Sequence, residues 1–275
     1  PPEMREDRGE IQAAIDGTLP QIVEEPNLLS DLHIHTDWSD GKGSIERMVC
    51  KALSRGLKLI AITDHSPTWK HIGSLTIESL ERQREEIERI RSQYKHKITI
   101  LHGAEVDIRE DGSLDFSDDV LSGLDFVVAS LHIALFQTPA EFTQRLLSAI
   151  HNPYVDMIAH PNGRENPRFQ GADADWDAVF SAARDEHVAL EINSNPYHLD
   201  LDEFRARQAA EMGIMLCINS DAHSEQKMDQ IKFGVSTARR AGLTPHQILN
   251  CLPVEEQLKW IQKHHTAHRK GAKKS

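Results

Sequence analysis

Cysteine is scarce in this sequence of 275 residues, and Cys50, Cys217 and Cys251 lie far apart without any Cys-x-x-Cys pair. Their odd number and wide spacing argue against a disulfide framework and against a thiolate metal site. No apolar run approaches the ~18 residues that a membrane helix needs, and no signal segment opens the sequence. These absences predict a cytoplasmic protein that does not use a membrane.

Positive charge is also in short supply, because 31 Lys and Arg residues face 43 Asp and Glu residues and give a net charge of -12. This balance disfavours a broad basic surface for nucleic acid, although a local positive centre can still bind phosphate. A Gly-x-Ser-x-Gly elbow, a P-loop and a Gly-rich dinucleotide pattern are all absent from the sequence, which excludes the commonest serine hydrolase and nucleotide-binding motifs.

Short apolar runs rich in Ile, Val and Leu recur along the chain, as expected of parallel strands that are buried on both faces. We predict strands over 28–36, 57–65, 98–107, 124–132, 155–161, 188–195 and 214–221. Helices with recognisable caps are predicted between them, over 44–56, 76–94, 138–152, 175–186, 202–212, 228–241 and 244–251. This alternation predicts an α/β fold in which seven parallel βα units wind into a TIM-like barrel, with an open doubly wound sheet as the alternative.

The composition suggests three segments. Residues 1–27 are polar and acidic and are interpreted as a linker or lead-in with a short helix over 10–15. Residues 28–262 form the predicted barrel, and residues 263–275 are predicted to be a basic, disordered tail.

Nearly every predicted strand ends in a residue that can bind a metal. These residues are His33, His35, Asp40, His65, Glu105, His132, His160, Asp221 and His223. Because the carboxyl ends of the strands of a βα barrel meet at one mouth, we expect these side chains to converge there. The other ten histidines are interpreted as surface or supporting residues, and His102 is expected to face the helical layer because its parity on the strand is opposite to that of Glu105.

Six imidazoles and three carboxylates exceed what one ion can bind, so two or three ions are expected, with a carboxylate such as Glu105 bridging them. Nitrogen and oxygen ligands without sulfur favour Zn, Mn or Fe. Such a centre can generate a metal-bound hydroxide and clamp the oxygens of an in-line displacement, which predicts phosphoester hydrolysis.

Several polar neighbours are candidates for supporting roles. Arg164, Arg168, Lys42 and Lys70 lie in loops on the predicted rim and are candidate substrate-binding residues, since cations there can hold a phosphate group. Asp31 and Asp64 are expected to orient imidazoles from outside the ligand set. One residue among Glu191, Asn193 and Asn195 is expected to reach the mouth, because the three share one face of a strand.

The motifs that carry these ligands resemble the polymerase and histidinol phosphatase (PHP) superfamily. They are His33-Ile-His35, Ile62-Thr-Asp-His65-Ser66, Gly103-Ala-Glu105-Val-Asp107, Ser130-Leu-His132, Ala159-His160-Pro161 and Asn219-Ser-Asp221-Ala-His223. Further matches, among them Leu190-Glu-Ile-Asn-Ser-Asn-Pro196, make residues 2 to about 260 similar to the C-terminal PHP domain of bacterial family X DNA polymerases.

The resemblance implies a distorted seven-stranded (βα)7 barrel with three divalent ions, Mn or Zn with Fe as a further option. One ion would take His33, His35, Glu105 and Asp221, a second Asp40, His65 and His223, and a third His132, His160 and the shared Glu105. It also implies a 3′-5′ exonuclease and 3′-phosphatase that processes DNA 3′ ends in repair, as part of a longer chain with an N-terminal polymerase domain.

Two alternatives share this set of ligands. The first is a phosphatase of the histidinol phosphate type, whose partner would be a phosphorylated small molecule. The second is a non-catalytic module that uses its metals for stability alone.

Overall fold

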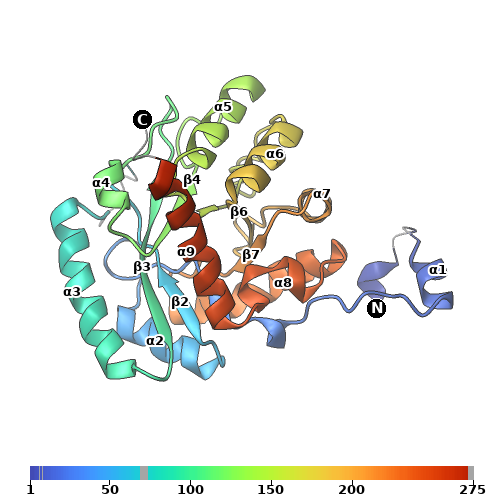
Figure 1. The fold of residues 1–275 in the computed structure, drawn as a ribbon, viewed down its shortest axis with the longest axis horizontal. Helices are drawn as coiled ribbons and strands as arrows, with labels where there is room; N and C mark the ends of the chain where they lie inside the picture. Colours follow the sequence, from blue (N-terminus) through green and yellow to red (C-terminus); the bar gives the residue numbers. More distant parts are fainter. Residues whose placement is uncertain (6, 8, 69–73, 272–275) are drawn as a thin grey trace.

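A single parallel sheet organises the molecule. The computed structural model describes residues 1–5, 7, 9–68 and 74–271, with side chains described through residue 262. Within this range seven parallel strands are joined in the order β1 to β7 and curve into a nearly closed barrel (Figure 1). The strands are β1 (Ser30–Asp31), β2 (Leu59–Ile62), β3 (Thr99–Asp107), β4 (Phe126–Ser130), β5 (Met157–Ile158), β6 (Ala189–Asn193) and β7 (Leu216–Asn219). Ile34 and Ala222 form one parallel bridge, which brings the first and last strand segments together. The predicted barrel is confirmed.

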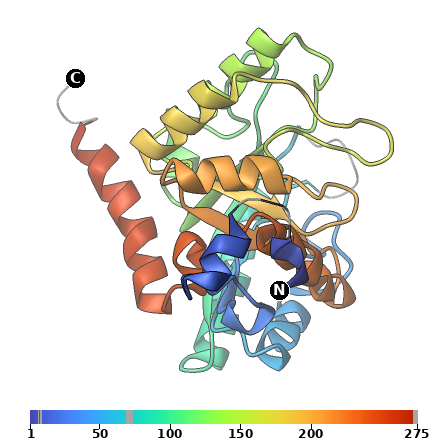
Figure 2. The same ribbon diagram turned by 90° about the vertical axis from the view of Figure 1, so that its right-hand side faces the viewer.

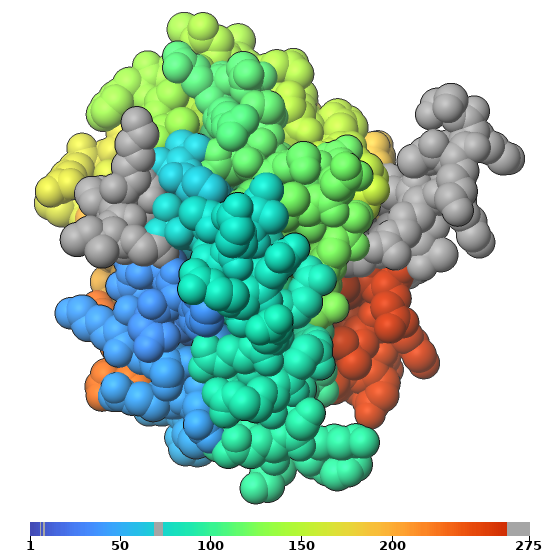
Figure 3. All heavy atoms as spheres, turned by 90° about the vertical axis from the view of Figure 1, so that its left-hand side faces the viewer, coloured from blue at the N-terminus to red at the C-terminus, as the bar shows by residue number. Residues whose placement is uncertain are grey.

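Most of the helices lie around the outside of the barrel (Figure 1). The helices are α1 (Glu10–Ile15), α2 (Ile45–Ser54), α3 (Ile77–Tyr94), α4 (Asp118–Leu121), α5 (Pro139–Ile150), α6 (Trp176–Glu186), α7 (Glu203–Glu211), α8 (Ile231–Arg240) and α9 (Val254–Gly271). Helix α1 buries none of its residues, and α9 lies at one end of the barrel. Figure 2 shows α5, α6 and α7 lying side by side on one flank, and Figure 3 shows the face that α2 and α3 cover. In the described part of the chain, none of the helices has the length and apolar character that crossing a membrane requires.

Local sequence explains where the helices begin. Thr138 accepts a hydrogen bond from the backbone N–H of Glu141, and the Glu141 carboxylate accepts one in return from the backbone of Thr138, with Pro139 at the first helical position. Ser44 and Thr76 cap α2 and α3 in the same side-chain manner. Such caps satisfy the otherwise unpaired N–H groups of a first turn.

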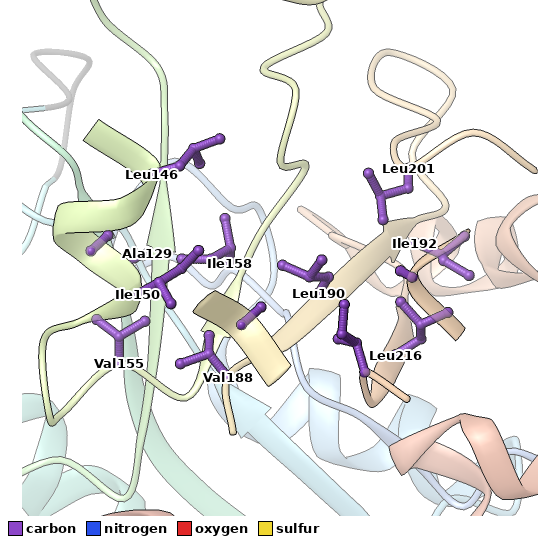
Figure 4. Packing of buried hydrophobic residues seen from close by; sticks show 14 of the residues in the cluster. Ala129, Leu146, Ile150, Val155, Ile158, Val188, Leu190, Ile192, Leu201 and Leu216 are labelled. Atoms are coloured by element: carbon purple, nitrogen blue, oxygen red, sulfur yellow. The ribbon is translucent and has the colours of Figure 1, made fainter. Parts of the chain in front are cut away.

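Alternation along the strands separates the outer layer from the barrel interior. On β6, Leu190 and Ile192 pack outward in the same apolar cluster as Leu146 and Ile150 of α5 (Figure 4). The intervening residues point inward, and near the strand starts they form a second apolar cluster. This interior cluster contains Leu59, Ala61, Leu101, Phe126, Val128, Met157, Ala159, Ala189 and Cys217, together with Ile261 of α9. Helix α9 therefore closes the end of the barrel at which the strands begin.

Three local predictions differ from the structure. The predicted first strand is regular only over Ser30–Asp31, because the following backbone bonds to single partners, as when His35 N–H donates to the Ala222 carbonyl at 3.0 Å. The predicted helix over 244–251 forms two 3-10 turns, η4 (Pro245–Gln247) and η5 (Leu249–Cys251). The predicted disordered tail begins inside α9, whose helical backbone continues to Gly271.

Candidate metal centre

Glu105 lies at the centre of the mouth, surrounded by imidazole rings. It projects inward from β3, and its side chain is 1% exposed. One carboxylate oxygen, Oε2, faces three ring nitrogens, whereas Oε1 faces two others. The distances from Oε2 are 3.0 Å to His65 Nδ1, 3.2 Å to His33 Nε2 and 3.4 Å to His35 Nε2, and those from Oε1 are 3.0 Å to His160 Nε2 and 3.4 Å to His132 Nε2. A single carboxylate thus joins two groups of imidazoles.

Asp221 and Asp40 supply the remaining negative charge. Asp221 follows β7 with a positive φ of 51°, and its Oδ1 lies 3.1 Å from His35 Nε2. Asp40 comes from the turn after the first strand, and its Oδ2 lies 3.2 Å from His223 Nε2 while its Oδ1 lies 3.7 Å from His65 Nε2. The structure therefore brings all nine predicted ligand residues to one place.

Three groups of possible ligand atoms lie within 4.8 Å of one another in the described part of the chain. They are His35, Asp40, His65 and His223; His33, His35 and Glu105; and His65, Glu105 and His132. These groups overlap with the three sets that the family pattern implies, but His35 and His65 each occur in two of them. His160 and Asp221 join the cluster through their contacts with Glu105 and His35.

Buried nitrogen and oxygen atoms without hydrogen bonds test whether this cluster fits metal ions. Nε2 of His33, both ring nitrogens of His35 and Oε2 of Glu105 make no hydrogen bond within the described residues. Buried polar atoms are normally satisfied, so a concentration of such atoms around one point calls for a missing partner. Imidazole and carboxylate donors without sulfur suit divalent Zn, Mn or Fe. The residues at the mouth fit such ions.

The charges in the cluster are strongly coupled. Burial opposes protonation of His33, but the carboxylates of Glu191, Glu105 and Asp221 outweigh burial and raise its pKa well above the ordinary value. Burial would raise the pKa of Glu105, yet the surrounding histidines hold it well below the ordinary range. The neighbouring histidines also hold the pKa of Asp221 well below its ordinary range, so Glu105 and Asp221 are ionised at neutral pH. They keep protons on some rings that bound cations would displace.

His35 behaves in the opposite way. Burial, together with the neighbouring His223 and His65, lowers the pKa of His35 to about 3. Its ring is stacked against each of these two, with centroids 4.2 Å from His223 and 4.4 Å from His65, while the centroids of those two rings are 6.1 Å apart. A neutral ring offers a nitrogen lone pair, which is the form that binds a metal.

Two outer carboxylates orient the histidines. His33 Nδ1–H donates to Glu191 Oε1 at 2.9 Å, and His132 Nδ1–H donates to Asp107 Oδ1 at 3.0 Å. Each bond fixes a ring with its Nε2 toward Glu105, an arrangement that is common around protein-bound metals. Asp107 was not predicted for this role, although it lies two residues after Glu105 on the same inward face of β3.

The prediction that Asp31 and Asp64 orient imidazoles is wrong. Asp31 accepts a hydrogen bond from the backbone N–H of Ser220 at 3.1 Å. Asp64 accepts bonds from the backbone of Thr36 and from the Gln83 side-chain amide, both at 2.7 Å. In the described part of the chain, both carboxylates therefore bond to backbone N–H groups and to polar side chains, and neither makes a hydrogen bond to an imidazole. The expectation for His102 is confirmed, since its Nε2 lies 3.1 Å from Gln83 Oε1 on α3.

A pocket of about 450 Å³ opens over the cluster. Of the predicted substrate-binding residues, Lys42 lines this pocket and is exposed. Arg168 is exposed beside Tyr197, whereas Arg164 is half-buried and directs Nη1 to the Leu199 carbonyl at 3.5 Å. Lys70 lies outside the described residues.

Sequence reasoning missed five residues of the pocket lining, namely Glu165, Tyr197, His198, Ser224 and Lys227. His198 Nδ1–H donates to the Arg164 carbonyl at 2.6 Å, and its Nε2 lies 3.8 Å from Asp221 Oδ2. Asn195, one of three candidates on the sixth strand, also lines the pocket, and its Nδ2 donates to Asp221 Oδ2 at 3.2 Å. The signal for Lys227 was its place in the segment after β7, six residues beyond Asp221.

A βα barrel whose mouth gathers six imidazoles and three carboxylates around an open pocket defines a metal-dependent hydrolase. Residues 31–195 match the PHP domain family, and the chain belongs to this family of metal-dependent phosphoesterases.

Three comparisons place it further. The chain is 38% identical over 256 residues to the DNA polymerase/3′-5′ exonuclease PolX of Bacillus subtilis, a match covering 93% of this chain and 44% of PolX. It is 32% identical to a protein of Thermoanaerobacter sp. (strain X514) named as a probable phosphatase, over 81% of this chain and 90% of that protein. The crystal structure of histidinol phosphate phosphatase from Lactococcus lactis, complexed with Zn, L-histidinol and phosphate, shares the fold with a TM-score of 0.56 at 16% identity, covering 76% and 93% of the two chains.

Proposed function

We propose that this chain hydrolyses phosphoester bonds at DNA 3′ ends, as a 3′-5′ exonuclease and 3′-phosphatase in repair. The observation that carries the proposal is the similarity to PolX, whose name includes the 3′-5′ exonuclease, over 93% of this chain. The chain spans less than half the length of PolX, so the proposal concerns the phosphoesterase step alone and takes no polymerase activity from the comparison.

Three divalent ions, Mn or Zn with Fe as a further option, are the proposed cofactors. His33, His35, Glu105 and Asp221 would hold one ion; Asp40, His65 and His223 a second; and His132 and His160, with Glu105 shared, a third. The two oxygens of Glu105 face different imidazoles, which supports a shared role. When bound, such ions activate water for attack on phosphorus and neutralise the phosphate oxygens.

The side chains of the mouth perform the remaining tasks. Glu191 and Asp107 fix the rings of His33 and His132, so that the ligand nitrogens need little reorganisation. Lys42 and Lys227 line the pocket as cations and would attract the phosphate group into it. Arg168 is proposed to contact the substrate farther out, whereas the half-buried Arg164 would act from the pocket wall.

A phosphatase for a small phosphomonoester, of the histidinol phosphate type, is the second candidate. It is favoured by relatives named as probable phosphatases, which the chain matches over most of their length. The pocket of about 450 Å³ also falls within the ~300–1,000 Å³ range typical of small-molecule sites.

Paired substrates separate the two candidates. The Mn-loaded chain is expected to shorten a 5′-labelled single-stranded oligonucleotide and to release its 3′ phosphate, with far higher kcat/KM than for p-nitrophenyl phosphate or histidinol phosphate. The reverse preference would establish the small-molecule phosphatase instead, and no turnover of any substrate would favour a non-catalytic module.

Variants of two histidines connect the activity to the cluster. His223→Ala removes the ring that contacts Asp40 and is expected to abolish turnover of the oligonucleotide. His151→Ala removes a histidine whose side chain is 56% exposed at the end of α5, and serves as the matched control with wild-type turnover. Equal activity of both variants would contradict the proposed site.

A further inference from the structure

An aromatic pair lies exposed beside the mouth. The Phe136 side chain is 87% exposed, more than any other large hydrophobic side chain among the described residues. Its ring centroid lies 5.0 Å from that of the half-buried Phe169, with 64° between the ring planes. This edge-to-face contact leaves a face of Phe136 open to solvent. A single exposed apolar side chain is ordinary on a protein surface, so the position of this pair and the way it is held decide whether it marks a binding surface.

The loop that presents Phe136 is firmly held. The neighbouring residue Leu135 is buried. Its side chain packs so closely on Gly163 that a Cβ at that glycine would lie only 2.9 Å from it. From α5 the buried Arg145 guanidinium donates to the carbonyls of Ile133 and Ala134, each at 3.1 Å, and to the Gln137 side chain at 2.8 Å. The backbone before Phe136 and the side chain after it are therefore held by Arg145, and a loose loop does not account for the exposure of the Phe136 ring.

The aromatic pair is continuous with the pocket wall. Phe136 follows His132 by four residues, a distance of at most about 14 Å along the chain. Phe169 exchanges two backbone hydrogen bonds with Glu165, at 2.7 and 2.9 Å. Glu165 lines the pocket and accepts a hydrogen bond from the Tyr197 hydroxyl at 3.2 Å. The two phenylalanines thus extend the mouth outward from the loops after β4 and β5.

Cations lie on the other side of the same mouth. Lys42 follows the first strand and Lys227 follows β7, so both approach the pocket opposite the loops after β4 and β5. Aromatic faces that receive bases, combined with cations that receive phosphates, are the means by which proteins bind single-stranded nucleic acid. With a net charge of -12 the chain gains little general attraction for DNA, so base contacts would carry a larger share of binding.

We propose that Phe136 and Phe169 form a stacking platform for the bases that precede the 3′-terminal phosphoester of a single-stranded substrate. The inference rests on the proposed function and names its substrate class, an unpaired 3′ end with accessible bases. A small phosphomonoester held over the cluster has no group that extends to Phe136, so the platform distinguishes a polynucleotide from a small substrate.

Binding measurements test the platform directly. The probe is a fluorescent oligo(dT) whose 3′-terminal linkages are phosphorothioates, and its affinity for the metal-loaded chain is read by anisotropy. Phe136→Ala is expected to raise Kd about tenfold, as expected for loss of stacking on one base. Phe136→Trp is expected to retain the affinity. The control Phe233→Ala removes another exposed phenylalanine, on α8, and is expected to bind as wild type does.

Removal of the bases provides the second arm. An oligonucleotide with abasic residues next to its 3′ end is expected to bind the wild type about as weakly as the intact oligonucleotide binds Phe136→Ala. The Phe136→Ala variant should bind the intact and the abasic oligonucleotides equally well. The ratio of oligonucleotide to p-nitrophenyl phosphate turnover is expected to fall in parallel. Independent, additive losses from the variant and from the abasic residues would overturn the platform.

The outcomes also separate the two levels of the proposal. If the wild type binds and trims the oligonucleotide while Phe136→Ala does so equally well, the platform is wrong and the proposed function stands. If the wild type neither binds nor trims DNA, the proposed function fails and the platform fails with it.

Discussion

The two ends of the barrel interior differ sharply, although the same strands build both. On β3, Leu101 belongs to the apolar interior cluster, while Glu105 lies two inward positions farther along, among the histidines. On β7, Cys217 packs in the apolar cluster and Asp221 lies at the mouth. Every second residue of a strand points into the barrel. The same strand therefore supplies an apolar side chain to the interior and, four residues later, a candidate ligand at the mouth.

This difference separates stability from chemistry. The lower interior is filled by apolar side chains and closed by Ile261 of α9, which is the arrangement that lowers the free energy of the folded state. The mouth instead concentrates buried ionisable groups, which costs folding energy unless partners compensate for it. Substitutions at the mouth should therefore alter metal binding and activity, whereas substitutions in the apolar interior cluster should alter the free energy of unfolding.

The largest effect is expected from Glu105→Gln at the mouth. The change removes the charge that faces five imidazoles, so metal content and turnover should fall by more than the ~10–100-fold that loss of an outer carboxylate costs. Elemental analysis and oligonucleotide turnover measure both quantities. Glu211→Gln, on the outer surface of α7, is the control. A Glu105 variant that kept its ions would show that metal binding does not depend on this carboxylate.

Phe126→Ala tests the lower interior. The Phe126 side chain is fully buried, and its loss should lower the free energy of unfolding by about 3–5 kcal/mol. Urea denaturation measures the loss. Metal content per folded molecule is expected to match that of the wild type, so a variant that lost its ions while keeping its stability would show that the two ends are not separable.

Asp200 links the mouth to pH. Burial raises the pKa of this carboxyl to about 7 in the fold, so its neutral form is favoured and its contribution to stability, complete below about pH 4, is lost as the pH rises through about 7. Asn at this position keeps an acceptor for the Asn162 backbone N–H, which lies 2.9 Å from Asp200 Oδ2. In metal-free protein, Asp200→Asn should be more stable than wild type by about 2–4 kcal/mol at pH 8.

The same variant should gain no stability at pH 4, where the wild-type carboxyl is also neutral in the fold. Thermal or urea denaturation at the two pH values measures this difference. An equal gain at both values would show that the change acts through packing and that ionisation of Asp200 has no part in it.

A smaller effect is expected from Asp107→Asn, which weakens the bond that orients His132. Affinity for the most weakly held ion should fall by about 10–100-fold, the usual cost of losing an outer carboxylate, as measured by competition with a chelating dye. Asp111→Asn, in an exposed turn, is the matched control. Unchanged affinity would mean that the ring is held by other contacts.

Local pattern was sufficient to predict the strands and the positions of the nine candidate ligands. Short β-branched runs specify buried parallel strands, and the barrel brings their ends together whatever the loops do, so His33 and Asp221 meet across 188 residues of sequence. The candidate ligand positions depend on strand order and parity, both of which the sequence encodes locally.

The remaining features depend on contacts that only the folded chain defines. Helix α9 packs Val254, Leu258 and Ile261 under the barrel, and their spacing is that of one apolar helix face, but the sequence does not specify which surface this face covers. Asp64 was assigned to a ring because it adjoins His65, whereas strand alternation turns it toward the Thr36 backbone. Phe136 is an ordinary loop residue in the sequence. Its proposed role follows only from its contact with Phe169 and from the nearby pocket, which the folded chain defines.

Anomalous diffraction from crystals of the Mn-loaded chain shows whether the cluster around Glu105 holds the ions. We expect anomalous peaks inside the cluster, with Glu105 shared between two of them and Asp40 ligating beside His223. An ordered mouth without anomalous peaks, with Asp40 turned away and the imidazoles bonded only to carboxylates, would contradict this expectation.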